Sequence, residues 1–465
     1  MPLRHLQAPA GAPVPFRIEL AVGSSLGLMV AEGQGEARRY VLRRLEQADV
    51  LDLFEALARD FGLRAPHARQ APAAVRGPPL RPILTEPVSS KILYGYGDPC
   101  VVRVGPADYR LLVTSNDAPD AFPILASRDL VSWRLTGFVF PETQAPAWTL
   151  VGAGVADFWA PELHRLGETW LVCFTARRDD GELAIGLARG RGPDGPFVGD
   201  AAPLLTGGVI DSHLLMDAAG QPWLIWKQDE TAVWPRLLAQ ALHRRPALAA
   251  ELFPAPADQR TAAFVLTLWP WIAEQTPMTQ FFALQLLIEA AADDLGAFEA
   301  RLVRAGAGLG ADERAGLERA RTALRTRVLA QRLSPDARRL LGEPIVILQN
   351  DLPWEGHLIE GVWITEDAGR YYLLYAGNDF STAHYGIGAA VARAPQGPYR
   401  KTAEVFLSST ADWWGPGHPS VALAPDGRRH IFLHAFRPGE AGYKAFRALL
   451  AAPLVLQDGV LAIDL

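Results

Sequence analysis

From Tyr94 onward the chain carries short β-strand patterns in recurring groups, separated by glycine, proline and aspartate. The first group lies at residues 101–104, 109–114 and 123–127. The second group lies at 158–165, 169–175 and 183–188, and the third at 209–216, 222–227 and 237–242. After a strand at 344–348, two more groups lie at 357–365, 371–376 and 387–392, and at 419–423, 430–434 and 444–449. Short strands at such regular spacing predict a meandering all-β architecture.

Two of these groups end in the same Gly-Pro-aromatic motif. Gly195-Pro196-Phe197 closes the second group and Gly397-Pro398-Tyr399 closes the fourth. A weak internal repeat with this period is typical of β-propeller blades. We therefore predict a mainly β fold, a five-bladed β-propeller with small four-stranded blades.

A long segment without strand patterns interrupts the groups between residues 244 and 342. Residues 279–303 and 311–331 are predicted to be helical, the second with one apolar stripe formed by Leu317, Ala320, Leu324 and Val328. Such a segment is too long for a propeller loop and indicates an inserted α-helical subdomain. Blades one to three would then occupy 93–243, and blades four and five with the closure would occupy 343–465.

The N-terminal part has a different pattern. Residues 1–70 are predicted to form a small α/β module, with a strand pair in 16–30 and an amphipathic helix in 40–61. The proline-rich residues 71–92 are interpreted as a linker. We expect the module and the helical insertion to pack on one another as a second, discontinuous domain, and a homo-oligomer would form through either of them.

Composition excludes several classes of function. The 465 residues carry a formal net charge of -6 with no long basic run, which argues against nucleic-acid binding. The most apolar region, 264–292, is broken by Glu274 and Pro277 and is predicted to be buried helix, not a membrane span. Residues 1–16 lack the apolar stretch of a secretory signal, so we expect a cytoplasmic protein. Cys100 and Cys173 are expected to be buried free thiols.

Three acidic residues lie at predicted strand entries beside apolar neighbours. They are Asp98, Asp211 and Glu360, at equivalent positions of the first, third and fourth groups. An acid in such a place is costly unless it is paired or functional. Each one alone could equally be a turn residue or a strand cap. Glu355, five residues before Glu360, is the main rival for the same role.

Several motifs in order resemble the family 43 glycoside hydrolases, which are five-bladed propellers acting on arabinose-, xylose- or galactose-containing glycans. The matching stretches are Gly97-Asp98-Pro99; Ser127-Arg128-Asp129-Leu130-Val131-Ser132-Trp133; Phe158-Trp159-Ala160-Pro161-Glu162-Leu163-His164; Gly195-Pro196-Phe197; Ile210-Asp211; Trp354-Glu355-Gly356 leading to Glu360-Gly361; and Gly415-Pro416-Gly417-His418. The resemblance covers residues 93–242 and 343–450.

The resemblance implies a role for each acid. Asp98 would be the general base that activates water, and Glu360 the general acid that protonates the leaving oxygen. Asp211 would be the third carboxylate, which raises the pKa of the acid by like-charge proximity and orients it. An inverting enzyme holds its base and acid roughly 6.5–9.5 Å apart, so that a water fits between them. One departure is Val362, where the family usually has proline after Glu-Gly.

Four further residues are candidates for contact with a sugar. Trp159 and Phe158 could offer a flat apolar face to a sugar ring, although Trp159 could instead pack between blades. Asp157 could hydrogen-bond sugar hydroxyls. His418 matches the family histidine near the channel, sometimes linked to a central calcium ion, and a satisfied core histidine is the alternative. No cofactor is required, and a structural Ca²⁺ in the central channel is the one metal that the resemblance suggests.

The resulting prediction is an inverting glycosidase that removes arabinofuranosyl, xylosyl or related residues from short oligosaccharides. The alternative is a carbohydrate-binding propeller that does not catalyse. A third hypothesis is a retaining propeller enzyme acting on fructosides, but Gly97-Asp98-Pro99-Cys100 replaces the Asn-Asp-Pro-Asn-Gly opening of that group.

Overall fold

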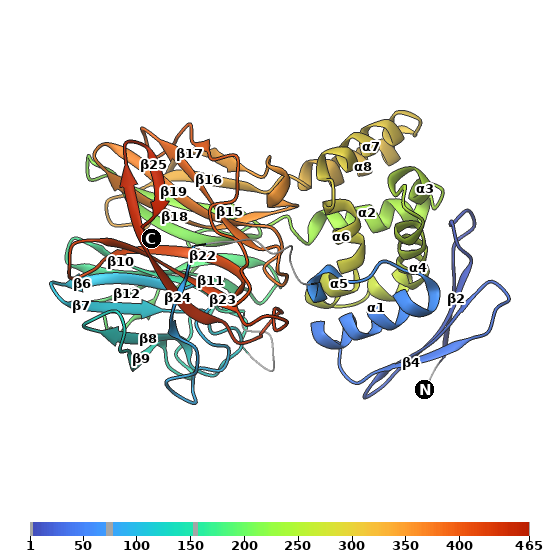
Figure 1. Ribbon diagram of the computed structural model, residues 1–465, viewed down its shortest axis with the longest axis horizontal. Coiled ribbons are helices and arrows are strands. Elements are labelled where there is room, and N and C mark those ends of the chain that lie inside the picture. The colour runs from blue at the N-terminus through green and yellow to red at the C-terminus, as the bar shows by residue number, and fades with distance from the viewer. Residues whose placement is uncertain (1–2, 71–77, 152–156, 465) are drawn as a thin grey trace. The chain divides into compact units, whose positions relative to one another are not determined.

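The computed structural model describes residues 3–70, 78–151 and 157–464. Its contacts divide the chain into two compact units (Figure 1). One, the helical unit, combines Met1–Gln70 with Glu230–Arg325, and the other, the sheet unit, combines Ala71–Asp229 with Thr326–Leu465. Residues 71–77 of the expected linker lie outside the described residues.

The sheet unit is built from antiparallel meanders whose strands follow one another in chain order. The first two sheets are β6 (Cys100–Gly105), β7 (Asp108–Leu112), β8 (Ala121–Ser127), β9 (Arg134–Phe140), and β10 (Trp159–Leu166), β11 (Thr169–Arg177), β12 (Leu183–Gly190), β13 (Val198–Gly199). The third is β14 (Val209–Met216), β15 (Pro222–Gln228), β16 (Arg327–Leu333), β17 (Leu340–Gln349). The last two are β18 (Ile359–Asp367), β19 (Arg370–Gly377), β20 (Gly386–Ala392), β21 (Arg400–Lys401), and β22 (Trp414–Leu423), β23 (Arg429–Phe436), β24 (Ala448–Gln457), β25 (Val460–Ile463). Repeated four-stranded meanders are consistent with a β-propeller.

The first strands of these sheets contact one another in a closed cycle. β6 contacts β10, β10 contacts β14, β14 contacts β18, β18 contacts β22, and β22 returns to β6. Each pair of neighbouring sheets also shares its own buried apolar cluster, for example Leu171 with Leu224 and Ile225 with Leu373. Apolar burial of this kind is the main stabilising contribution to such a fold.

A strand from the expected linker joins the last sheet. β5 (Arg81–Leu84) pairs antiparallel with β24, with Leu84 opposite Leu449. The prediction of a linker throughout 71–92 is therefore wrong at this point. Pro82 lacks a backbone donor, but an edge position tolerates it, so the prolines did not exclude a strand.

The helical segment lies inside the third sheet rather than after it. It connects β15 to β16, so the predicted boundaries of 244 and 342 are both displaced. The expected strand at 237–242 belongs to helix α2 (Val233–Arg244), where Trp234, Leu238 and Leu242 are buried at a helical spacing. The expected helix over 311–331 ends earlier, and β16 follows it. Val328 and Leu329 pack against different sheets, and an apolar strand buried on both faces cannot be told from helix by periodicity.

The helical unit begins with a four-stranded sheet, followed by helices. The elements are β1 (Arg4–Gln7), β2 (Phe16–Val22), β3 (Leu26–Glu32), β4 (Arg38–Leu42), α1 (Gln47–Phe61), η1 (His67–Arg69), then α2, α3 (Leu248–Leu252), α4 (Pro256–Ile272), α5 (Pro277–Ala283), α6 (Gln285–Ala292), α7 (Leu295–Ala307) and α8 (Ala311–Ala323). The predicted strand pair in 16–30 is present as β2 and β3. The predicted helices at 40–61 and 279–303 are each interrupted: β4 precedes α1, and three helices share the second range.

The N-terminal module and the inserted helices pack together, as we expected. The Phe16 ring on β2 lies 5.9 Å from the Phe264 ring on α4. Arg64, which follows α1, donates to Asp258 Oδ1 at 3.1 Å and to the Asp293 carboxylate at 2.6 Å. These contacts join segments that are 194 residues or more apart in sequence.

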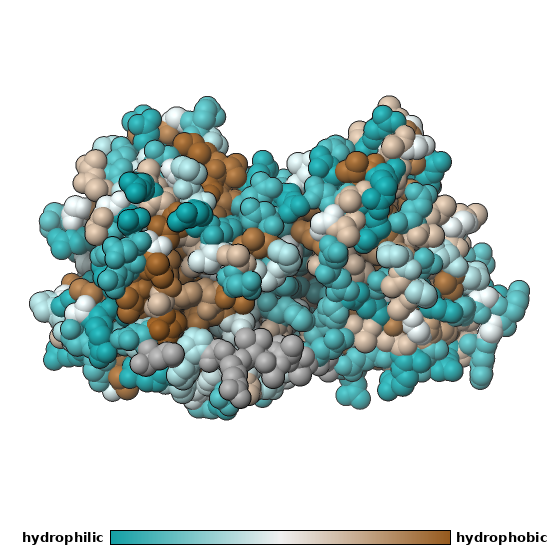
Figure 2. All heavy atoms as spheres, turned by 45° about the horizontal axis from the view of Figure 1, so that its top comes forward, coloured by the Kyte–Doolittle hydropathy of each residue, from teal (hydrophilic) through white to brown (hydrophobic). Residues whose placement is uncertain are grey.

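Both cysteines are buried free thiols, which confirms that prediction. Within the described residues, no helix is long and apolar enough to cross a bilayer. On the face drawn in Figure 2, apolar side chains gather over the sheet unit more than over the helical unit. Large exposed apolar residues of the helical unit include Val41 and Val303, which lie on different elements, so homo-oligomer formation through this unit stays a prediction.

Candidate active site

A backbone irregularity recurs at the same point of every innermost strand. Asp98, Ala160, Asp211, Gly361 and His418 all have positive φ, between 45° and 55°. In β10, β14, β18 and β22 the pairing register breaks at this position, directly after the residue that precedes it. A residue other than glycine seldom adopts this conformation, and bulges of this kind re-aim side chains next to functional sites.

The recurrence corrects one prediction. Asp98 and Asp211 do occupy equivalent positions, but Glu360 lies one residue before its equivalent, which is Gly361. Glu360 is instead equivalent to Trp159, the last paired residue before the register break. The proposed acid therefore projects from the last paired residue of its strand, whereas Asp98 and Asp211 project from the positive-φ position itself.

The carboxylate of Asp98 is held by groups that favour its ionised form. Arg447 Nη1 donates to Oδ1 at 2.8 Å, and the Thr114 hydroxyl donates to Oδ2. The backbone N–H of Asp98 donates to His434 Nδ1 at 3.1 Å. Burial alone would raise the pKa of Asp98, but Arg447 and the nearby imidazoles outweigh it and hold the pKa well below its usual value. Asp98 is therefore held in its ionised form.

Glu360 has a different environment. Lys227 Nζ lies 2.9 Å from Oε2, and the Tyr385 hydroxyl donates to Oε1 at 2.9 Å. Burial, followed by the carboxylates of Glu360 and Asp98, raises the pKa of Tyr385 well above its usual value, so Tyr385 remains a neutral donor. Each carboxylate oxygen of Glu360 therefore accepts one hydrogen bond, from Lys227 or from Tyr385.

Asp211 links the two sides of the site. Its Oδ2 accepts the backbone N–H of Gly361 at 2.9 Å, and its own N–H donates to Thr175 Oγ1 at 3.2 Å. Burial and the nearby carboxylates of Glu360 and Asp98 together raise the pKa of Asp211 to about 7, against the opposing charges of His418 and Lys227. The predicted third carboxylate is therefore positioned beside the acid, and its proton affinity is unusually high for an aspartate.

His418 lies against both Asp98 and Gly361. Its Nδ1 is 3.5 Å from Asp98 Oδ1, and a Cβ added to Gly361 would lie 2.8 Å from the same nitrogen. Only glycine fits at 361, because both its positive φ and this close approach exclude a side chain. The side chains at His418 do not fit the calcium expectation. Ca²⁺ prefers six to eight oxygens, whereas His418 offers nitrogen and Asp98 is already held by Arg447 and Thr114.

The rival acid Glu355 lies outside this group. It is fully buried, and its carboxylate accepts from Asp351 N, Leu352 N, the Tyr375 hydroxyl and Lys401 Nζ. With its oxygens occupied in this way, Glu355 stabilises the segment that contains η2 (Pro353–Glu355). It has no free lone pair directed to a substrate.

The sugar-contact candidates divide into two kinds. The Trp159 ring is half-buried, donates its N–H to Asn116 Oδ1 at 3.0 Å and has Arg177 6.0 Å from its centre. Asp157 is buried, and Arg177 Nε donates to its Oδ2 at 2.6 Å. Trp159 thus keeps exposed surface beside the site, whereas one oxygen of Asp157 is already occupied by an ion pair.

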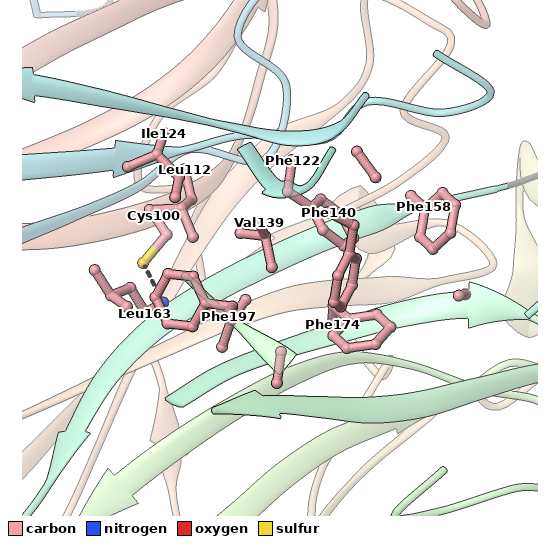
Figure 3. Close-up of a cluster of buried hydrophobic side chains, with 14 of the residues drawn as sticks. Cys100, Leu112, Phe122, Ile124, Val139, Phe140, Phe158, Leu163, Phe174 and Phe197 are labelled. Carbon is pink, nitrogen blue, oxygen red and sulfur yellow. Dashed lines mark hydrogen bonds between the residues drawn. The ribbon is translucent and has the colours of Figure 1, made fainter. Parts of the chain in front are cut away.

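The expectation that Phe158 faces a sugar is wrong. Its side chain is 2% exposed and packs edge-on against the Phe122 ring at 5.5 Å. Figure 3 shows Phe158 within the buried aromatic group that also contains Phe140 and Phe174. Successive side chains of a strand point in opposite directions, so Phe158 faces the core while Trp159 faces away from it.

Several residues of the site were not predicted from the sequence. They are Thr114, Lys227, Tyr385, His434 and Arg447. Lys227 had a usable signal, because it stands alone in the apolar strand Pro222–Gln228. Arg447 and Tyr385 had none, since each meets its carboxylate through the fold.

A second buried group of titratable residues lies on β10 and β14. His164 Nε2 is 2.7 Å and His213 Nδ1 is 2.9 Å from Glu162 Oε2. The backbone N–H of Ile364 donates to His213 Nε2, so Nδ1 carries the proton that Glu162 accepts. A metal bound at Nδ1 of His213 would leave the proton on Nε2, which already accepts the backbone N–H of Ile364. The geometry therefore fits a hydrogen-bonded core network better than a metal site.

The chain is similar to known glycoside hydrolases. The family model for glycosyl hydrolases family 43 matches residues 85–247 and 317–461. No curated protein sequence matches the chain. Among solved structures, a thermostable family-43 glycoside hydrolase is 24% identical with a TM-score of 0.55, and the match covers 80% of this chain and 93% of that one.

Two further structures are similar. An endo-1,4-beta-xylanase from Bacteroides thetaiotaomicron VPI-5482 is 18% identical, with a TM-score of 0.53 and coverage of 81% of this chain and 96% of that one. A xylan beta-1,4-xylosidase from Bacillus halodurans C-125 is 18% identical, with a TM-score of 0.52, and the match covers 80% of this chain and 56% of the longer enzyme. At these identities the likeness shows the fold.

The mainly β fold and the family match define an enzyme of the glycosidase class. More specifically, the chain belongs to glycosyl hydrolases family 43.

Proposed function

We propose that this protein is an inverting glycosidase that removes arabinofuranosyl, xylosyl or related residues from short oligosaccharides. The observation that carries the proposal is the proximity of three carboxylates from different strands or strand entries: Glu360 and Asp98 both act electrostatically on Asp211, which also accepts the backbone N–H of Gly361. Two carboxyl groups of opposite protonation are what glycoside hydrolysis requires.

In this reaction Asp98 is the general base. A water molecule attacks the anomeric carbon, and its proton passes to the Asp98 carboxylate as the new C–O bond forms. Arg447 and Thr114 support the role, because they keep the carboxylate ionised and fix its orientation.

Glu360 is the general acid. As the glycosidic C–O bond breaks, the Glu360 carboxyl gives its proton to the leaving oxygen, and its negative charge remains on the enzyme. Asp211 supports this role from the adjacent backbone, where it holds Gly361 and adds a nearby acidic group. Trp159 would stack on the sugar with His418 beside it, while Asp157, whose oxygens accept from Arg177 and Tyr443, would fix the edge of this surface.

We also propose that the sheet unit is a five-bladed propeller and that the helical segment is an insertion within its third blade. The closed cycle of innermost strands and the repeated positive-φ position support this architecture. The cytoplasmic location stays a prediction, and it would favour short imported oligosaccharides over polymers. The similarity in fold to a xylanase and a xylosidase, whose substrates contain xylose, supports a pentose substrate.

Hydrolysis of aryl glycosides of arabinofuranose, xylopyranose and galactofuranose tests the proposal. We expect turnover of at least one glycoside by the wild-type protein and its loss in Asp98→Asn. Sugar binding by calorimetry without turnover of any of them would instead support a non-catalytic carbohydrate-binding propeller.

A further inference from the structure

Lys227 is a charged residue buried within the sheet unit. It lies on β15 with only 2% of its surface exposed, between apolar residues that include Trp226. A buried ammonium group is costly unless it is paired with a carboxylate. Its position therefore calls for a specific role.

The partners of Lys227 are acidic and close. Its Nζ lies 2.9 Å from Glu360 Oε2 and 3.4 Å from Asp229 Oδ1. Burial alone would lower the pKa of Lys227, but Glu360, Asp229 and Asp211 outweigh it and raise the pKa above its usual value. Lys227 is consequently charged throughout the working range of an enzyme.

We propose that Lys227 is a positioning residue for the general acid: it binds Oε2 of Glu360, confines the acidic proton to Oε1 and stabilises the carboxylate that remains after proton donation. The inference rests on the proposed function. An ammonium group has only donors, so Oε2 must accept. Oε1 faces the Tyr385 hydroxyl, which can either donate or accept and so tolerates both protonation states.

Other titratable groups face this pair from neighbouring strands. Asp211, Asp229 and His357 face Lys227, while Tyr385 and Asp211 face Glu360. Among the described residues, Lys227 is the one cation within 4.0 Å of the Glu360 carboxylate. Removing its charge should therefore make ionisation of Glu360 harder, and no other cation compensates at that distance.

The pH dependence of kcat/KM tests this role. In Lys227→Met we expect the alkaline limb to move up by about one to three pH units, since a nearby opposite charge has an effect of that size. Lys227→Arg keeps the charge and should restore the wild-type limb. Asp229→Asn removes a competing carboxylate and should move the limb down. Lys401→Met breaks a similar buried Lys–Glu pair, with Glu355, and should leave the limb in place. An unmoved limb in Lys227→Met would overturn the proposal.

A measurement without turnover separates this inference from the proposed function. The carboxyl ¹³C signal of Glu360, assigned with Glu360→Gln, gives its titration midpoint in the wild type, Lys227→Arg and Asp229→Asn. We expect the midpoint to fall in Asp229→Asn and to stay close to wild type in Lys227→Arg. A protein that hydrolyses no glycoside but shows this pattern would contradict the proposed function and keep the Lys227–Glu360 coupling. An equal midpoint in the wild type and Asp229→Asn would overturn the coupling, whatever the activity.

Discussion

Asp211 Oδ2 accepts the backbone N–H of Gly361 at 2.9 Å, so the third carboxylate is tied to the residue that follows the proposed acid. This contact exists because both residues occupy the same positive-φ position in neighbouring innermost strands. The fold thus places the Asp211 carboxylate beside the proposed acid, although the two residues are far apart in sequence.

The raised pKa of Asp211 predicts a stability cost that depends on pH. A carboxyl with a raised folded-state pKa stabilises the protein below its ordinary value near 4, and this contribution is lost as pH rises through about 7. Asp211→Asn keeps an oxygen for Gly361 and removes the charge. We expect it to increase the free energy of unfolding by about 1–3 kcal/mol more at pH 8 than at pH 5.

Thermal unfolding at the two pH values measures this difference. Asp412→Asn, a change at an exposed aspartate, should leave the stability at both pH values within about 0.5 kcal/mol of the wild type. Equal effects of Asp211→Asn at pH 5 and pH 8 would contradict an elevated pKa at this position.

Asp98→Asn should remove the general base. We expect kcat to fall by about 10²–10⁴-fold for every glycoside that the wild type hydrolyses, because general-base catalysis contributes that much. Steady-state rates give the loss, and calorimetry shows whether sugar binding persists. Retention of wild-type kcat would exclude Asp98 as the base.

Glu360 and Glu355 can be distinguished by one matched pair of variants. Glu360→Gln should lose about 10²–10⁴-fold in kcat on substrates with poor leaving groups and far less on aryl glycosides with good ones. Glu355→Gln should mainly lower the melting temperature, since Glu355 joins Tyr375 and Lys401 away from the acid group. The reverse pattern of rates would assign the acid to Glu355.

Gly361→Ala should disturb the position of Glu360. Its φ of 55° and the approach of His418 Nδ1, 2.8 Å from an added Cβ, should cost about 1–3 kcal/mol of stability and also reduce kcat. Gly369→Ala is the control, because Gly369 has positive φ but open space around it. If both variants kept wild-type kcat, the Gly361 contact would not position the acid.

Parts of this site could be predicted from sequence because they depend on local patterns. Asp98 and Asp211 stand at strand entries that the alternation of short strands and turns reveals. The one-residue offset of Glu360 was missed, since a bulge changes the register without changing the pattern of apolar residues. Phe158 is predicted to contact a sugar because it neighbours Trp159, but its side chain is buried in the core on the opposite side of the strand.

The partners of the carboxylates could not be predicted, because they come from distant parts of the chain. Arg447 reaches Asp98 across 349 residues, and Lys227 reaches Glu360 across 133. Strand β16 was missed for another reason: it follows the helical segment and is buried on both faces, so its apolar residues continue the preceding helical stripe. Only the tertiary structure identifies these distant partners and shows where the helical segment ends and strand β16 begins.

The anomeric configuration of the first sugar released tests the central claim most directly. Proton NMR during hydrolysis of the best glycoside by the wild-type protein distinguishes the two anomers before they interconvert. An inverting Asp98–Glu360 pair predicts that the first product has the configuration opposite to that of the substrate. A first product with the same configuration would contradict the account, because Asp98 would then act as a nucleophile rather than as a base for water.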